Sequence, residues 1–195
     1  DRLPSEVTTN VNDGVRSMKS HTAGMQFRFR SATLRLRLSW SLLKGTLGSH
    51  NLSWSGKSGV DVYRRAGRDW IYVGTGRVSN LRCNAAEFAW NPGDEGIVYL
   101  PSYDSVGKIE IGVDAGTTLE PAPARASGIV RPVVFYGTSI TQGACASRPG
   151  MAYANIAGRC GDFPVVNLGF SGAGRMEMEM CDYVARLEAS VYVID

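Results

Sequence analysis

Histidine is scarce in this chain, which has only His21 and His50 among its 195 residues. The cysteines have neither the density of a disulfide scaffold nor the C-x-x-C spacing of many zinc and redox sites, so we interpret them as small buried apolar residues. No group of His, Cys and carboxylate residues has the spacing of metal ligands, and we expect neither a metal nor a cofactor. The four cysteines are Cys83, Cys145, Cys160 and Cys181.

Long apolar runs and blocks of like charge are also missing. No run approaches the roughly 18 residues that a membrane span needs, and the first residues lack a charged-then-apolar leader. The net charge is +3, from 21 Lys and Arg against 18 Asp and Glu. Its basic residues are scattered, and those at positions 28, 30, 35 and 37 alternate with apolar ones, as on the solvent face of a sheet. We expect no membrane and no nucleic-acid partner; the compartment stays open, with a secreted or periplasmic location favoured over the cytoplasm.

The first part of the chain has the pattern of short antiparallel strands. Apolar residues alternate with polar ones at 25–29 and at 34–42, which is the period of a strand with one buried face. Further short apolar runs follow, separated by turns rich in Gly, Ser and Asn. This spacing predicts a β-sandwich over 1–125. The other runs are Val60–Tyr63, Trp70–Val73, Ile97–Leu100 and Ile109–Val113.

A different pattern begins after a linker predicted at 126–131. The runs at 133–136, 165–168 and 191–194 are short and wholly apolar, as in strands covered on both faces. Between them, Ser147 before Pro149 indicates a helix start, and Met176 and Met180 recur at helical spacing and are expected in the core. The order βαβαβ predicts a flavodoxin-like parallel sheet over 132–195, truncated after its third strand.

Two loops follow the first two of these strands, where reactive groups gather in parallel sheets. The first contains Ser139, placed just behind a glycine that permits a tight turn. The second contains Gly172, which could bring a backbone N–H close to that hydroxyl without a side chain in the way. The glycines around Ser139 do not form G-x-S-x-G, which excludes the nucleophile elbow of α/β-hydrolases.

Four segments carry a family resemblance. Val134–Gly143 (VFYGTSITQG) resembles the first block of SGNH/GDSL hydrolases, with Thr138 where many members have Asp, and Asn167–Gly172 (NLGFSG) resembles the second block. Gly59–Tyr63 (GVDVY) is similar to the G-x-D-L-Y signature of an N-terminal β-domain in one branch of that family, and Cys145–Met151 fits the same branch.

The resemblance implies a serine esterase. Its nucleophile would be Ser139, and the N–H groups of Ser139 and Gly172 would form the oxyanion hole. Loop or substrate support would come from Thr138, Arg148 and Asn167. The substrate would be a small acyl ester, and the expected class is an acetyl group on a carbohydrate. Ala173 departs from the family, which often has a polar residue at that position.

The family also implies an oxyanion-hole Asn after the third strand and a later D-x-x-H pair, for which this sequence offers no positions up to Asp195. We interpret His21 and His50 as loop or strand-end residues and not as the base. A missing triad base costs roughly a millionfold in turnover, so we expect the 195-residue chain alone to be nearly inactive.

Two alternatives remain from other functional classes. The β-sandwich could be a carbohydrate-binding module that uses Trp40, Trp54, Trp70 or Trp90 as stacking platforms, although tryptophans of this kind are mostly core residues. The loop Gly169–Gly174, with Asp195 about twenty residues later, could belong to a dinucleotide-binding unit, although its glycines stand in the order G-x-x-G-x-G.

Overall fold

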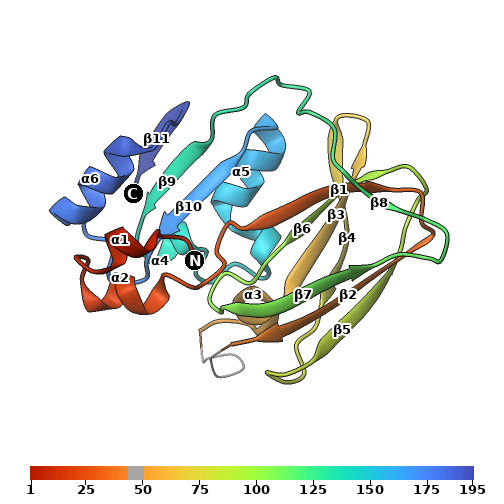
Figure 1. The fold of residues 1–195 in the computed structure, drawn as a ribbon, viewed down its shortest axis with the longest axis horizontal. Coiled ribbons are helices and arrows are strands. Elements are labelled where there is room, and N and C mark those ends of the chain that lie inside the picture. The colour runs from red at the N-terminus through yellow and green to blue at the C-terminus, as the bar shows by residue number, and fades with distance from the viewer. Residues whose placement is uncertain (44–50) are drawn as a thin grey trace.

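The computed structural model describes residues 1–43 and 51–195, so His50 lies outside the described residues. Figure 1 shows a β-rich part beside a part in which helices flank three strands, with the N-terminus in the second of these. No helix among the described residues combines the length and apolar character needed to cross a bilayer.

The β-rich part consists of two antiparallel sheets (Figure 1). One has the strand order β4-β3-β6-β1-β8 and the other β5-β2-β7, and a short helix, α3 (Trp54–Ser58), precedes β3. The strands are β1 (Gln26–Ser31), β2 (Arg35–Leu42), β3 (Val60–Ala66), β4 (Asp69–Gly76), β5 (Asn84–Ala89), β6 (Glu95–Tyr99), β7 (Val106–Gly112) and β8 (Leu119–Pro121).

The alternation along β2 builds the core between these sheets. Leu36, Leu38 and Trp40 are buried, and they pack with Val62 of β3 and Val98 of β6. The intervening residues of β2 are exposed or half-buried, as the period of two predicts. The interpretation of Trp40 as a core residue is therefore confirmed.

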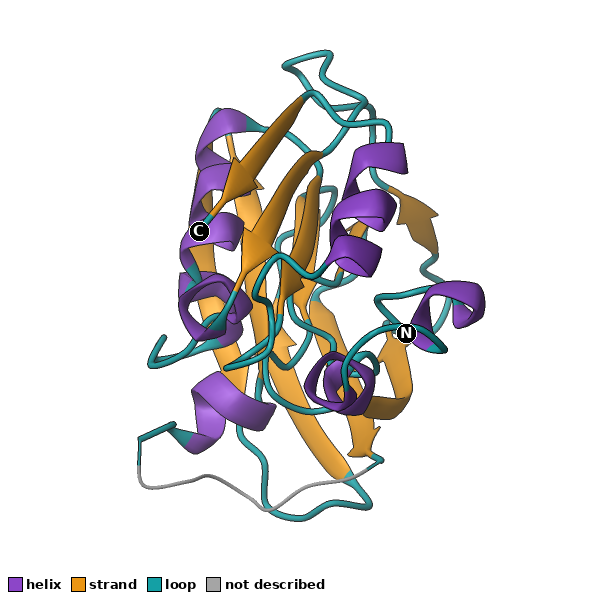
Figure 2. Ribbon diagram, turned by 90° about the vertical axis from the view of Figure 1, so that its left-hand side faces the viewer, coloured by secondary structure: helices purple, strands orange, loops and turns teal. Residues whose placement is uncertain are grey.

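The second part contains three parallel strands in the order β10-β9-β11. Its strands are β9 (Val133–Gly137), β10 (Val165–Gly169) and β11 (Val191–Ile194), and its helices are α4 (Ser139–Gln142), the 3-10 helix η1 (Pro149–Met151), α5 (Tyr153–Gly161) and α6 (Met178–Arg186). Figure 2 shows helices flanking the strands.

The first residues of the chain belong to the core of this second part. Helices α1 (Ser5–Thr8) and α2 (Asp13–Met18) follow each other, and Val7 and Val15 are buried in one cluster with Tyr136 of β9 and Leu168 of β10. The chain thus starts beside the parallel sheet, continues through the strands of the β-rich part, and then forms the parallel sheet itself. Leu3, Val7, Val11 and Val15 lie in the predicted range 1–125, but their side chains pack in the core of the second part.

Two side-chain predictions were wrong. Met176 is 48% exposed with a φ of 61°, because α6 begins only at Met178, whereas Met180 on the helix is fully buried as predicted. The cysteines are not buried either. Three are exposed and Cys181 is half-buried, and all four are free. Cys145 occupies a left-handed turn and Cys83 precedes β5, so neither faces a core.

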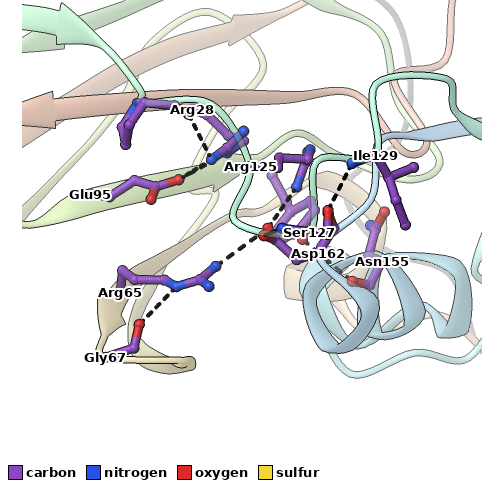
Figure 3. Close-up of polar contacts among 11 residues, drawn as sticks. Arg28, Arg65, Gly67, Glu95, Arg125, Ser127, Ile129, Asn155 and Asp162 are labelled. Carbon is purple, nitrogen blue, oxygen red and sulfur yellow. Dashed lines mark hydrogen bonds and ion pairs between the residues drawn. The ribbon is translucent and has the colours of Figure 1, made fainter.

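A polar cluster joins the two parts (Figure 3). Asp162, the C-cap residue that follows α5, pairs through Oδ1 with Arg65 of β3 and with Arg125, each at 3.4 Å. The other carboxylate oxygen of Asp162 accepts the N–H of Ser127 at 3.2 Å. All three charged side chains are 10–16% exposed, so the cluster is largely removed from water.

Candidate active site

The ends of β9 and β10 bring the two predicted loops into backbone contact. Gly137 and Gly169 are partners in the parallel register, and the N–H of Phe170 donates to the carbonyl of Gly137 at 2.9 Å. A Cβ at Gly169 would lie 2.1 Å from the backbone N of Gln142, the last residue of α4. Only glycine permits so close an approach, so the helix that starts at Ser139 rests directly on the start of the second loop.

Ser139 is the first residue of α4 and is half-buried. Its backbone carbonyl accepts hydrogen bonds from the N–H of Ala144 at 2.8 Å and from the hydroxyl of Tyr103 at 3.0 Å. Among the described residues, none forms a hydrogen bond with the Ser139 hydroxyl. The backbone of this serine is therefore fixed, while its hydroxyl has no competing partner in that part of the chain.

Gly172 lies in the second loop with a φ of +70°, and a Cβ there would meet no atom within 4 Å. The space beside it is therefore open. Its carbonyl accepts from Nε of Arg175 at 2.8 Å. The next residue, Ala173, is buried against Gly14 of α2, and its carbonyl accepts from Nδ2 of Asn12 at 3.1 Å. A polar side chain would not suit that contact, which gives a local reason for the alanine.

Asn167 links the two loops. Its Nδ2 donates to the carbonyl of Thr141 in α4 at 2.7 Å, and its Oδ1 accepts the N–H of Gly169 at 2.9 Å. The side chain is buried, and burial strengthens these two hydrogen bonds. Thr138 precedes α4 and makes no capping hydrogen bond with its side chain, although its carbonyl accepts the N–H of Gln142 at 3.1 Å.

Arg148 lies at the contact between the two parts of the molecule. Its Nε is 3.5 Å from Oδ2 of Asp61, the acid of the G-x-D-L-Y-like motif, and its guanidinium lies 4.1 Å from the ring centre of Tyr72. Asp61 also accepts the N–H of Gly150 at 2.8 Å and the hydroxyl of Thr75. Burial raises the pKa of Asp61 to about 6, although these donors, Arg148 and Arg159 oppose the shift. The motif thus holds the loop that follows α4.

Tyr103 and His21 enter the site from the β-rich part and the N-terminal segment. The Tyr103 ring lies 6.4 Å from that of His21, and Nδ1 of His21 lies 3.0 Å from Nε2 of Gln142. Burial, reinforced by the charges of Arg2 and Lys57, lowers the pKa of His21 to about 4. The sequence pattern gave no signal for these contacts, since 121 residues separate His21 from Gln142.

Arg2 contacts the start of the second loop. Its guanidinium donates to the carbonyls of Gly169 at 2.6 Å and Met18 at 2.9 Å, and it lies 4.4 Å from the centre of the Phe170 ring. Burial lowers the pKa of Arg2 to about 9. An arginine that caps carbonyls in this way satisfies them but needs tertiary packing to offset its desolvation.

The dinucleotide-binding alternative disagrees with the strand order. In such a unit, the strand before the glycine-rich loop pairs with the strand that carries the acid. Here β9 lies between β10 and β11, and the carboxylate of Asp195 accepts a hydrogen bond of 2.8 Å from Thr141. The acid therefore sits beside the first loop and not beside the glycines of the second, so the strand order does not fit this alternative.

Two models of protein families match the chain. Residues 130–195 match the GDSL-like lipase/acylhydrolase family, and residues 1–119 match the GxDLY-type N-terminus of SGNH hydrolase-type esterases. The chain belongs to the SGNH/GDSL esterase family. The family resemblance stated from the sequence is thereby confirmed, including the branch with the GxDLY N-terminus. A search of curated proteins found no match.

Solved structures share the fold of this SGNH/GDSL family member. A protein described as a GDSL-like lipase from Bacteroides ovatus has 27% identity and a TM-score of 0.90, over 100% of this chain and 57% of its own. A salicylyl-acyltransferase, SsfX3, has 17% identity and a TM-score of 0.73, over 98% and 52%. A family two carbohydrate esterase from Clostridium thermocellum has 13% identity and a TM-score of 0.53, over 90% and 59%. The chain thus spans a little over half of each.

The described residues contain no cluster of three or more His, Cys, Asp or Glu side chains that could hold a metal ion. Of the four tryptophans, Trp40 and Trp90 are buried, Trp70 is half-buried and Trp54 is 55% exposed. One tryptophan therefore remains as a candidate platform for a sugar ring.

Proposed function

We propose that this protein is a serine esterase in which Ser139 is the nucleophile. The Ser139 Oγ would attack the acyl carbon, while the N–H groups of Ser139 and Gly172 stabilise the oxyanion of the tetrahedral intermediate. Collapse of the intermediate releases the alcohol and leaves an acyl-enzyme, which water then hydrolyses. The contact of Gly169 with Gln142 is the observation that carries this proposal, since it brings the two loops together.

The proton of Ser139 needs a base, and we assign that base to a segment after residue 195. His21 contacts Gln142, and its lowered pKa reflects burial among positive charges. A D-x-x-H pair and an Asn in that later segment would complete the site. The 195-residue chain is accordingly expected to turn over esters close to the background rate, because loss of a triad base costs about 10⁶-fold.

The proposed substrate is a small acyl ester, with acetyl groups on carbohydrates as the first class to test. In support, the fold is shared with a carbohydrate esterase solved with cellohexaose. The fold is also shared with a salicylyl-acyltransferase, and in acyl transfer an acceptor other than water takes the acyl group from the acyl-enzyme. We further propose that the β-rich part is a β-sandwich. The three parallel strands would be the start of a flavodoxin-like sheet.

The decisive experiment compares Ser139→Ala with the parent in the full-length protein, meaning this chain with the segment that follows residue 195. Hydrolysis of p-nitrophenyl acetate should fall by about 10⁶-fold in kcat, while Ser17→Ala, an exposed serine on α2, should change nothing. Full activity of the Ser139→Ala protein would overturn the assignment of the nucleophile.

The second candidate function is carbohydrate binding by the β-rich part. The exposed Trp54 side chain is the observation that favours it. Binding to a glycan array should be lost in Trp54→Ala and retained in Ser139→Ala if this part recognises sugars. Binding that neither substitution affects would remove Trp54 from consideration.

A further inference from the structure

Gln142 connects three segments that are far apart in the sequence. It ends α4, three residues after Ser139, and its side chain is fully buried. Its Nε2 lies 3.1 Å from the carbonyl of Ser102, to which it donates, and 3.0 Å from Nδ1 of His21. Its Oε1 accepts the N–H of Ser171 at 2.9 Å. Every polar atom of the amide therefore has a partner.

These partners fix the orientation of the amide. The carbonyl of Ser102 can only accept and the N–H of Ser171 can only donate, so the Gln142 amide cannot be turned over without losing both hydrogen bonds. With Nε2 as a donor, Nδ1 of His21 must accept, which requires the neutral tautomer with its proton on the other ring nitrogen. The lowered pKa of His21 agrees with that neutral form.

The bond to Ser171 acts on the peptide next to the proposed oxyanion donor. Ser171 directly precedes Gly172, whose N–H belongs to the peptide plane that follows. The backbone of Gln142 belongs to α4, the helix that also contains Ser139. The Gln142 side chain therefore sets the distance between Ser139 and the loop that contains Gly172. An oxyanion hole works because its donors are oriented before the reaction starts.

We propose that Gln142 is a positioning residue that holds the Phe170–Ser171 peptide, and through it the N–H of Gly172, in register with Ser139, and that His21 serves as its neutral hydrogen-bond acceptor. This inference rests on the proposed esterase function. It assigns His21 a role in the site that is not proton transfer.

The test uses Gln142→Met, His21→Asn and His21→Leu in the full-length protein, with p-nitrophenyl acetate as substrate. Methionine keeps the length of Gln142 and removes its hydrogen bonds. Asparagine can place its Oδ1 near the position of Nδ1 of His21 and has no titratable side chain. Leucine offers no hydrogen-bond acceptor. We expect Gln142→Met and His21→Leu to lower kcat by about tenfold to hundredfold with KM nearly unchanged, since a misaimed oxyanion donor acts on the transition state.

His21→Asn should restore most of the activity that His21→Leu loses. Loss of activity in His21→Asn as severe as in Ser139→Ala would overturn the proposal, because it would make His21 part of the proton transfer. Wild-type kcat in Gln142→Met, beside an inactive Ser139→Ala, would also overturn it and leave the esterase function standing. If Gln142→Met does not fold, the two His21 variants decide the question. An active Ser139→Ala protein would instead refute the esterase proposal itself.

Discussion

The hydroxyl of Tyr103 donates a hydrogen bond of 3.0 Å to the backbone carbonyl of Ser139. Tyr103 follows β6 in the β-rich part, and its own N–H donates to the carbonyl of Lys57 at the end of α3. The β-rich part therefore touches the backbone of the proposed nucleophile itself. In this molecule it is part of the scaffold of the site and not only an appended module.

Tyr103→Phe should weaken this connection without removing the ring. The carbonyl of Ser139 keeps the N–H of Ala144, so we expect a loss of about 0.5–1.5 kcal/mol in the free energy of unfolding. Urea denaturation would measure this loss. In the full-length protein, kcat for p-nitrophenyl acetate should fall by less than about tenfold. Tyr192→Phe is the control, since its hydroxyl also donates to a backbone carbonyl, that of Leu187, away from the loops. Equal changes in kcat for both variants would contradict a role for Tyr103.

Asp61 should make the protein less stable as the pH rises. Its pKa is about 6 in the folded protein and near 3.8 when unfolded. Between these two pH values the folded chain binds a proton that the unfolded chain releases. The stability that Asp61 contributes is therefore present at low pH and is lost as the pH rises through about 6. Asp61→Asn removes this dependence. From pH 4 to pH 7 the variant should gain roughly 2–3 kcal/mol relative to the wild type.

Urea denaturation of both proteins at these two pH values measures that gain. His21, whose lowered pKa acts in the opposite direction, is present in both and cancels in the difference. A difference that stays constant with pH would mean that Arg148 and Arg159 keep the Asp61 carboxylate ionised throughout.

Asp162 should contribute more than an ordinary surface ion pair. It contacts Arg65, Arg125 and the N–H of Ser127 in a largely dehydrated cluster, and it has a left-handed φ of 49°. Asparagine tolerates that conformation, so Asp162→Asn tests the charge alone. We expect a loss of about 2 kcal/mol, between the values for exposed and buried pairs.

Glu188→Gln provides the comparison for Asp162→Asn. It removes the partner of Arg131 in a pair whose side chains are 64% and 82% exposed, and it should cost less than about 0.5 kcal/mol. Equal unfolding free energies for Asp162→Asn and Glu188→Gln would show that the cluster adds no stability beyond that of an exposed pair.

The sequence predicted those features that depend on local periodicity. The alternation at 34–42 became β2, and the wholly apolar runs became β9, β10 and β11. It did not predict β5, whose Asn84–Ala89 contains three small alanines and lacks a clear alternation of large apolar residues. Local pattern is a weak guide where small residues make the contacts.

The contacts that position the site were not predictable, because they join residues far apart in the chain. Arg2 reaches Gly169 across 167 residues, and His21 reaches Gln142 across 121. A family motif locates Ser139 and Gly172, but it says nothing about which side chains hold them. Helices as short as α1 and α2 also carry too few turns for a helical period to stand out.

Gly169 and Gly172 should respond differently to alanine. At Gly169 the new Cβ would lie 2.1 Å from the backbone N of Gln142 and 2.6 Å from the backbone C of Thr141, and backbone cannot rotate away. Gly169→Ala should therefore cost about 3 kcal/mol or more in stability and separate the two loops. At Gly172 the Cβ meets nothing within 4 Å, so only the positive φ is unfavourable, at about 1–2 kcal/mol.

Gly172→Ala should nevertheless impair the full-length enzyme, because its methyl group would enter the open space that the acyl ester is proposed to occupy. We expect KM for p-nitrophenyl acetate to rise while the protein stays folded. Gly116→Ala is the matched control: it has a φ of +83° and also open space around the Cβ, but it lies in a turn before β8, in the β-rich part. Both variants should lose similar stability, measured by urea denaturation, and only Gly172→Ala should lose activity. Unchanged kinetics in Gly172→Ala would place the substrate away from this loop and would contradict the proposed oxyanion hole.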